Sequence, residues 1–265
     1  MGRIQFFELL DLPWWPRVFR NGCTSYLQWI SSKLNIFYVA PPIIVSGLKN
    51  LKSPTILDLG SGAGGPWLSF YQEVLSSVPN CKIILSDKYP NRDGVSLVDK
   101  IKHANLTYKN ESVDALKVNI ESQLLRTQFF SFHHFNPVQA KSLLSDTMKR
   151  EQGILIFDGS SKDKWKGILS SPLIFFMTLL SSPFWKPFKK SNLLFSLFPI
   201  IPLSVMFDGI VSYLRFYSKK ELEEIISEAD PSGSYQWKVE DVKTKYGWIT
   251  YMSGFPIEKD KVMKA

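Results

Sequence analysis

The chain has 265 residues, of which 45% are hydrophobic and 21% are charged, and its formal net charge is +8. A chain of this length and composition can bury a large core, which excludes a disordered protein. Cys23 and Cys81 are too few and too far apart for a disulfide framework or a closely spaced zinc site. We therefore expect a reducing, cytoplasmic environment. Glu8 and Asp11 interrupt the apolar N-terminus, so it does not resemble a signal peptide.

The pattern of apolar residues and prolines divides the chain into a helical N-terminus and an alternating α/β region. Residues 1–50 predict short helices that form a cap, because prolines interrupt their helical spacing. From residue 51, apolar β-rich runs alternate with amphipathic helices, which is typical of a parallel, doubly wound sheet. The predicted strands are 55–60, 81–87, 105–114, 126–134 and 153–159, with helices at 66–78, 136–153 and 218–230 and a closing hairpin at 235–244 and 247–254.

Residues 160–217 separate the fifth predicted strand from the next helix, which is far more than the usual connection of about 2 to 6 residues. This insertion contains two uncharged runs, 168–185 and 193–207, and residues 159–207 carry six lysines against one aspartate. Because Pro172 and Pro183 should interrupt the first run, we expect two short hydrophobic helices that dip into one leaflet of an anionic membrane. The alternative is an aromatic lid that packs on the N-terminal cap.

A glycine-rich turn follows the first predicted strand, where residues 58–65 read DLGSGAGG. Glycine allows positive φ there, and it lets a ligand approach the backbone at the start of the next helix. Gly60, Gly62 and Gly65, followed by Asp87, fit the dinucleotide fingerprint GxGxxG with its distant acid. The same segment also fits a pattern in which an acid precedes three alternate glycines.

In that second pattern, Asp58 with Gly60, Gly62 and Gly64 resembles the first motif of the class I S-adenosylmethionine-dependent methyltransferases. The runs ILSD at 84–87 and SVDAL at 112–116 resemble the second and third motifs of that family. The resemblance covers about residues 55–158 and 218–256. It implies a Rossmann-like, seven-stranded sheet with an antiparallel C-terminal hairpin, and S-adenosylmethionine as cofactor. The cofactor-binding residues that it implies are Asp58, Gly60, Ser61, Gly62, Gly64, Asp87, Val113 and Asp114.

Charge also separates the two interpretations of the glycine turn. A carboxylate at Asp58 could pair with the ammonium of a methionyl donor, whereas it would repel a pyrophosphate. This favours a methyltransferase, and an NAD-dependent oxidoreductase remains the alternative.

His133 and His134 end the fourth predicted strand, which places them at the ligand crevice of an open α/β sheet. We treat both as candidate catalytic residues that act as a base or position the acceptor. Since neighbouring strand residues point to opposite faces, one of them should reach the pocket. A buried structural histidine is the alternative. No metal is expected, because no cysteine or clear carboxylate partner lies nearby in the sequence.

The sequence thus predicts methyl transfer to a lipophilic small molecule or lipid-like acceptor by a cytoplasmic protein, peripheral on the inner face of a membrane. A methyltransferase for a soluble hydrophobic metabolite is the alternative, and nucleic acid is not expected as a partner. The domains predicted are a cap at 1–50 and a methyltransferase domain at 51–265. Further polar candidates for the pocket wall, each of which also fits a packing role, are Arg20, Thr24, Tyr26, Asp208, Arg215 and Tyr217.

Overall fold

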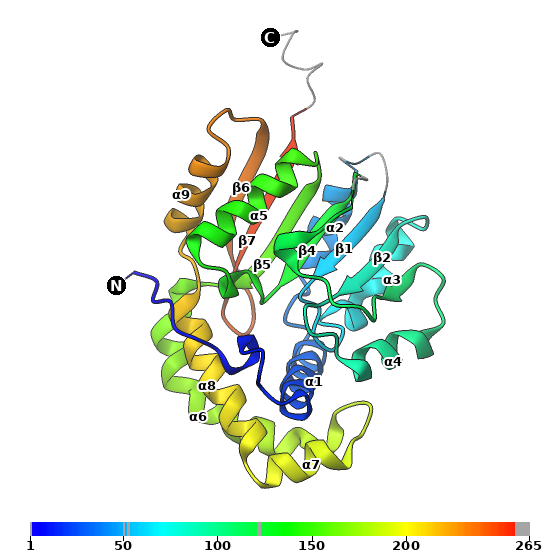
Figure 1. Cartoon of the computed structure of the whole chain (residues 1–265), viewed down its shortest axis with the longest axis vertical. Helices are drawn as coiled ribbons and strands as arrows, with labels where there is room; N and C mark the ends of the chain where they lie inside the picture. Colours follow the sequence, from blue (N-terminus) through cyan, green and yellow to red (C-terminus); the bar gives the residue numbers. More distant parts are fainter. Residues whose placement is uncertain (1, 50, 52–53, 121–122, 258–265) are drawn as a thin grey trace.

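A seven-stranded sheet in the order β3-β2-β1-β4-β5-β7-β6 forms the centre of the computed structural model, which describes residues 2–49, 51, 54–120 and 123–257 (Figure 1). Strands β1 to β5 are parallel, and β7 pairs antiparallel with both β5 and β6. This confirms the predicted α/β sheet and its closing hairpin. The strands are β1 Thr55–Leu59, β2 Lys82–Ser86, β3 Leu106–Tyr108, β4 Leu125–Phe129, β5 Gly153–Gly159, β6 Tyr235–Lys243 and β7 Trp248–Pro256.

Helices cover both faces of the sheet and bury a separate apolar cluster on each. On one face, α2 (Ala40–Leu48), α3 (Trp67–Ser77) and α4 (Arg92–Ile101) pack over β1, β2 and β4. On the other face lie α5 (Pro137–Lys149) and α9 (Lys219–Ala229). Helices α5 and α9 both begin with a capping box, so the predicted start at Ser218 is confirmed. The sequence analysis missed α4.

The predicted fourth strand, 126–134, is too long. Strand β4 ends at Phe129 because Phe130 has a φ of 47°, a left-handed conformation that interrupts extended backbone. His133 and His134 therefore lie in a 3-10 turn, Phe132–His134, beyond the end of the strand. Their side chains do not alternate between the two faces of the sheet.

The two helices before β1 pack in different places, one against the sheet and one against the insertion. Helix α2 belongs to the core of the sheet, because Gly47 lies against Leu155 and Phe255. Helix α1 (Arg17–Lys33) instead packs with the insertion at the carboxyl ends of the parallel strands (Figure 1). The short 3-10 turn Leu9–Asp11 precedes it. The cap predicted for residues 1–50 therefore corresponds to the first part of that range.

The insertion forms three helices, α6 (Lys164–Ser181), α7 (Lys190–Leu197) and α8 (Ile200–Arg215). Pro172 lies inside α6 without ending it, so the expectation of a break there is wrong. Packing compensates for the hydrogen bond that proline removes: Gly167 of α6 lies directly against the ring of Tyr213 in α8. Within the described residues, one helical stretch, Ser161–Phe184, is long and apolar enough to cross a membrane, and 28% of its most apolar window is buried.

Candidate functional site

A cavity of about 520 Å³ opens between the carboxyl ends of the parallel strands and the N-terminal segment. This volume lies within the range of about 300 to 1,000 Å³ that is usual for small-molecule sites. One wall carries residues 60–63, 65–66, 87–89 and 113–116, and the opposite wall carries residues of 5–11 and α1. From the insertion, only Arg215 is among the described residues that line the cavity. The N-terminal segment, and not the insertion, therefore forms most of the wall opposite the sheet.

The turn after β1, which we call the glycine loop (Gly60–Gly65), follows a path that side chains would obstruct. Gly60, Gly62, Gly64 and Gly65 all have φ between 52° and 107°, in the region that favours glycine. A Cβ on Gly60 would lie 3.0 Å from Ser131. The backbone N–H of Gly62 donates to Asp87 Oδ2 at 2.7 Å, and its carbonyl accepts from the Tyr108 hydroxyl at 2.6 Å. The loop is thus held from β2 and β3 with bare backbone toward the cavity.

Asp58 lies beneath the glycine loop and is not among the cavity-lining residues. Its carboxylate accepts hydrogen bonds from Ser61 Oγ at 2.5 Å and from Thr127 Oγ1 at 2.6 Å. Burial raises the pKa of Asp58 to about 6, although both hydroxyls favour the ionised form. The direct ion pair with a ligand ammonium that the sequence suggested does not match this placement, and Asp58 instead holds the base of the loop.

Asp87 directly follows β2 and lines the cavity beside the glycine loop. Each of its oxygens accepts one backbone N–H, Oδ2 from Gly62 and Oδ1 from Tyr89, both at 2.7 Å. Burial raises the pKa of this carboxyl, and the two N–H donors oppose that rise. Because a carboxylate oxygen can accept more than one hydrogen bond, Asp87 retains capacity for a ligand hydroxyl.

Val113 and Asp114 continue the same wall. The Val113 N–H donates to the Asp87 backbone carbonyl at 2.9 Å, which ties this segment to the end of β2. Asp114 caps the following turn by accepting the Leu116 N–H at 3.0 Å, and its other oxygen pairs with Lys88 at 3.0 Å. Burial would raise the pKa of Asp114, but these two partners lower it.

The rest of the cavity lining is mainly apolar and aromatic. It includes Phe7, Leu27, Ile36, Phe37 and Phe130, among other residues. Gln128 adds a polar group there: it is buried, and its side-chain oxygen has no hydrogen-bond partner among the described residues. A buried oxygen without a donor is costly in a closed structure, so Gln128 is suited to accept a hydrogen bond from a ligand.

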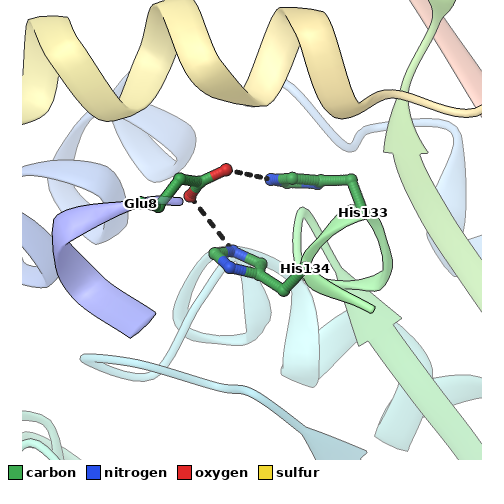
Figure 2. A group of neighbouring side chains, drawn as sticks. All are labelled: Glu8, His133 and His134. Carbon is green, nitrogen blue, oxygen red and sulfur yellow. Dashed lines mark ion pairs between the residues drawn. The ribbon is translucent and has the colours of Figure 1, made fainter. Parts of the chain in front are cut away.

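His133 and His134 meet Glu8, which the N-terminal segment brings between them, and Figure 2 shows the carboxylate facing both rings. Glu8 Oε1 lies 3.5 Å from His133 Nε2, and Glu8 Oε2 lies 3.5 Å from His134 Nε2. His134 lines the cavity, whereas His133 is 2% exposed and is not among the lining residues. One histidine, His134, lines the cavity, as expected. The cause is the 3-10 turn beyond β4 and not the alternation of side chains along a strand.

Further charged groups complete what we call the histidine cluster: Glu8, His133 and His134 with Asp11, Asp158 and Arg215. Asp158 Oδ1 lies 2.8 Å from His133 Nδ1, and Asp11 Oδ1 lies 2.7 Å from His134 Nδ1. Arg215 donates to both histidine carbonyls and to Asp11 Oδ2. The premise that no carboxylate lies near the histidines is therefore wrong, because the fold supplies three.

These carboxylates determine the protonation of the two imidazoles. Burial alone would lower the pKa of His133, but Asp158 and Glu8 raise it to about 9. Burial is likewise outweighed at His134, whose pKa is raised by Glu8 and Asp11. An imidazole that is already protonated cannot accept a proton from a substrate. In this arrangement the histidines are poorly suited to act as a general base.

The structure brings most of the predicted cofactor-binding residues to one wall. The lining residues are Gly60, Ser61, Gly62, Asp87, Val113 and Asp114, whereas Asp58 and Gly64 lie behind them. Of the further polar candidates, Arg20, Thr24 and Arg215 line the cavity, and Tyr26, Asp208 and Tyr217 do not. The sequence analysis gave no site role to Glu8, Asp11, Gln128 and Asp158. Asp158 had one available signal, since it stands near the carboxyl end of the fully buried strand β5.

Comparison with known proteins gives structural matches alone. No family model matches the sequence, and no curated protein matches it. A provisionally named O-methyltransferase from Nostoc punctiforme aligns with 86% of this chain and 60% of its own at 14% identity, with a TM-score of 0.50. Human N-acetylserotonin methyltransferase, in complex with S-adenosylmethionine, aligns over 88% of this chain and 56% of its own, at 15% identity and a TM-score of 0.48.

Magnesium protoporphyrin IX methyltransferase from Synechocystis, with bound S-adenosylhomocysteine, aligns over 82% of both chains at 10% identity and a TM-score of 0.48. The present chain thus spans less than two thirds of the length of the first two proteins. The strand order and the likeness to the Nostoc protein establish the fold. The chain has the fold of the class I S-adenosylmethionine-dependent methyltransferases.

Proposed function

We propose that this protein is an S-adenosylmethionine-dependent methyltransferase whose acceptor is a lipophilic small molecule or lipid. The observation that carries the proposal is the joint placement of the glycine loop and Asp87 on one wall of the cavity, within a class I methyltransferase fold. The solved structures of human N-acetylserotonin methyltransferase and the Synechocystis enzyme contain S-adenosylmethionine or its demethylated product.

The residues of this wall fit such a cofactor. Bare backbone at Gly60 and Gly62 leaves room for a ligand, and Asp87 is suited to accept hydrogen bonds from ribose hydroxyls. Val113 and Asp114 would border the adenine. The unpartnered oxygen of Gln128 is suited to accept a bond from an ammonium group. When bound, the cofactor supplies an activated methyl group on a sulfonium.

The chain's own contribution is to align the acceptor and to exclude water. An acceptor atom held in line at about 3 to 3.5 Å from a reactive carbon gains most of its rate from proximity. Phe7, Leu27 and Phe37 offer apolar surface for such positioning. His134 lies at the same cavity within the histidine cluster, where it can position a polar group of the acceptor.

The loop geometry disfavours the alternative of an NAD-dependent oxidoreductase. In a dinucleotide site, backbone N–H groups of the glycine turn face the pyrophosphate. Here the Gly62 N–H is bonded to Asp87 and the Gly64 N–H to the Ser61 carbonyl at 2.9 Å. A pyrophosphate would therefore meet a carboxylate in place of free donors.

The insertion supports a membrane location, because its helices α6 and α7 are apolar on the outside. Helix α6 buries small or polar residues such as Gly167, Ser171 and Thr178. Its large apolar side chains are exposed, with Leu169 80% exposed. Helix α7 repeats the pattern, since Asn192 and Ser196 are buried while apolar neighbours face outward. The exposed apolar residues of this surface are Trp165, Leu169, Leu173, Phe176, Leu180, Phe184, Phe188, Leu194, Leu197, Phe198 and Leu203.

An inverted arrangement of this kind is typical of helices in an apolar solvent, where small residues mediate helix packing. Exposed lysines at both ends of the surface, Lys166, Lys186 and Lys190, suit anionic headgroups. Phe207 of α8 also packs on Phe6 and Phe7, and Phe7 lines the cavity. Aromatic side chains therefore run from the insertion to the cavity mouth, which would let a lipophilic acceptor enter from the membrane.

Isothermal titration calorimetry with S-adenosylhomocysteine and NAD tests the cofactor. We expect heat of binding with the first and none with the second. Binding of NAD alone would overturn the methyltransferase proposal.

Flotation with vesicles that contain an anionic lipid tests the membrane location. Leu169→Ser should reduce the fraction of protein that floats with the vesicles. Val138→Ser should not, because Val138 is equally exposed but belongs to α5 and not to the insertion. Equal flotation of the two variants, or none by the wild-type protein, would contradict the membrane part of the proposal.

A further inference from the structure

At the centre of the histidine cluster, the Glu8 carboxylate faces two imidazoles at distances longer than those of a charge-assisted hydrogen bond. Glu8 and His133 are both 2% exposed, so water is largely excluded from their facing atoms. His133 Nε2 nevertheless has no hydrogen-bond partner among the described residues. A buried polar atom in that state is costly, which indicates that the cluster holds a further group.

The distances identify the kind of group. Where carboxylates and imidazoles pair directly in this cluster, the atoms lie 2.7 to 2.8 Å apart, as charge-assisted hydrogen bonds do. Glu8, in contrast, places Oε1 at 3.5 Å from His133 Nε2 and Oε2 at 3.5 Å from His134 Nε2, and one ligand atom from each of the three residues lies within 4.8 Å of the others. Ligand atoms about 2.0 to 2.1 Å from a tetrahedral metal are separated by about 3.3 to 3.4 Å. The spacing thus matches neighbouring ligands of one ion better than it matches hydrogen bonds.

We infer that Glu8, His133 and His134 bind a divalent transition-metal ion, of the zinc class, in the wall of the cavity. Two imidazole nitrogens and one carboxylate form a donor set that suits such ions and leaves coordination positions for water or substrate. The inference concerns a site within this chain, and it does not rest on the proposed methyl transfer.

The surroundings of the three ligands support this assignment. Asp158 and Asp11 hold the Nδ1 atoms of the two histidines and so turn both Nε2 atoms toward Glu8. Carboxylates that fix the far nitrogen of a ligating histidine are the usual outer partners of protein metal sites. Asp208 accepts the N–H groups of Leu9 and Leu10, which anchors the turn that carries Glu8.

Charge is consistent with a divalent ion as well. Three carboxylates touch the two imidazoles, and Arg215 contributes one positive charge against them. Imidazoles that bind an ion are neutral, so two negative charges would remain, and a divalent cation would neutralise them in place of two protons. Arg215 Nη1 lies 3.3 Å from Glu8 Oε1, where it would hold the ligating carboxylate from outside.

The position of the site indicates what the ion could do. His134 and Asp11 line the cavity, so the ion would lie beside bound substrate. An exchangeable position on such an ion can bind a substrate oxygen and lower the pKa of its hydroxyl. That role would supply a means of removing a proton from a bound substrate.

Zinc uptake by the full chain tests the inference. Protein dialysed against a chelator is titrated with Zn²⁺ in competition with a chromophoric chelator, and Co²⁺ reports the ligand geometry through its visible absorption. We expect one ion per chain. Glu8→Gln, which keeps the side-chain shape, and His134→Gln should each weaken binding more than about 100-fold. Asp158→Asn should weaken it about 10- to 100-fold, as outer partners do.

His103→Asn is the matched control, because the third histidine is exposed and lies away from the cluster. It should bind zinc like the wild type. Circular dichroism of each variant shows whether it folds, and Glu8→Gln provides the test if a histidine variant does not. No uptake by the wild-type protein, or uptake that Glu8→Gln leaves unchanged, would overturn the inference and leave the cluster as a network of ion pairs.

Discussion

The glycine loop and the histidine cluster face the same cavity, but different interactions hold them. The loop is fixed by backbone conformations that glycine permits and by hydrogen bonds to groups at the ends of the neighbouring strands, such as Asp87 and Tyr108. The cluster joins charged groups from four separate segments, between Glu8 and Arg215. A local turn can thus be recognised from its residues, whereas a site that depends on buried charge exists only once distant segments have folded together.

The comparison predicts that the largest loss of stability follows from removing a charge of the histidine cluster. Arg215 is buried, and it contacts Asp11, Glu8 and the carbonyls of both histidines. Arg215→Gln would leave buried carboxylates without their partner, and we expect the free energy of unfolding to fall by about 3 to 5 kcal/mol. Urea denaturation measures this. Arg92→Gln on the exposed side of α4 should change it by less than about 0.5 kcal/mol. A loss below 1 kcal/mol at Arg215 would remove the contrast between the two regions.

A buried carboxyl group, that of Asp58, lies beneath the glycine loop, and its contribution to the free energy of unfolding depends on pH. Burial raises the pKa of Asp58 to about 6 from an ordinary value of 3.8. Because the raised pKa favours the protonated folded state, this contribution to stability is full below about pH 4 and is lost as the pH rises through 6. The stability of Asp58→Asn relative to the wild type should therefore increase by about 2 to 3 kcal/mol between pH 4 and pH 7.5.

Urea denaturation at both pH values gives this difference, and pH-independent effects of the substitution cancel in it. Asp99→Asn, at an exposed position of α4, should show no such change. A difference for Asp58→Asn that stays constant across the range would mean that the carboxyl titrates normally beneath the loop.

The same contrast explains how much the sequence could predict. The sheet, the hairpin and the start at Ser218 were predictable because alternating apolar runs, glycines and capping residues act locally. The glycine loop and Asp87 were predictable for that reason also. The end of β4 was not predictable. Phe130 adopts a left-handed conformation there, and a phenylalanine in the sequence does not indicate such a conformation as a glycine would.

Long-range placement accounts for the remaining differences. Glu8 looked like a polar interruption of an apolar terminus, and nothing in its neighbourhood points to His133. Asp58 had the right residue type for a ligand contact, but it is buried beneath the loop and does not line the cavity. Pro172 predicted a helix break that packing between α6 and α8 overrides. Tertiary contacts decided each of these cases.

A smaller effect, on ligand affinity, should distinguish Asp87, which lines the cavity, from Asp58, which is buried beneath the glycine loop. If Asp87 accepts ribose hydroxyls, Asp87→Asn removes a charged acceptor, and affinity for S-adenosylhomocysteine should fall about 10- to 100-fold. Calorimetry measures the affinity, with Asp99→Asn as the control of equal charge change. Undiminished affinity in Asp87→Asn would show that the ribose is held elsewhere on this wall.

The smallest expected effect concerns the support behind the glycine loop. Gly94 in α4 lies so close to the loop that a Cβ there would come within 2.6 Å of the Ala63 backbone. Alanine normally stabilises a helix relative to glycine by about 0.5 to 1 kcal/mol, and Gly209→Ala in α8, where a Cβ would make ordinary contacts, should do so. Gly94→Ala should instead lower stability by about 1 to 3 kcal/mol, because rigid backbone cannot yield. Thermal denaturation of the two variants tests this prediction. Gly209→Ala should raise the melting temperature and Gly94→Ala should lower it. An equal rise for both would mean that α4 moves freely away from the loop.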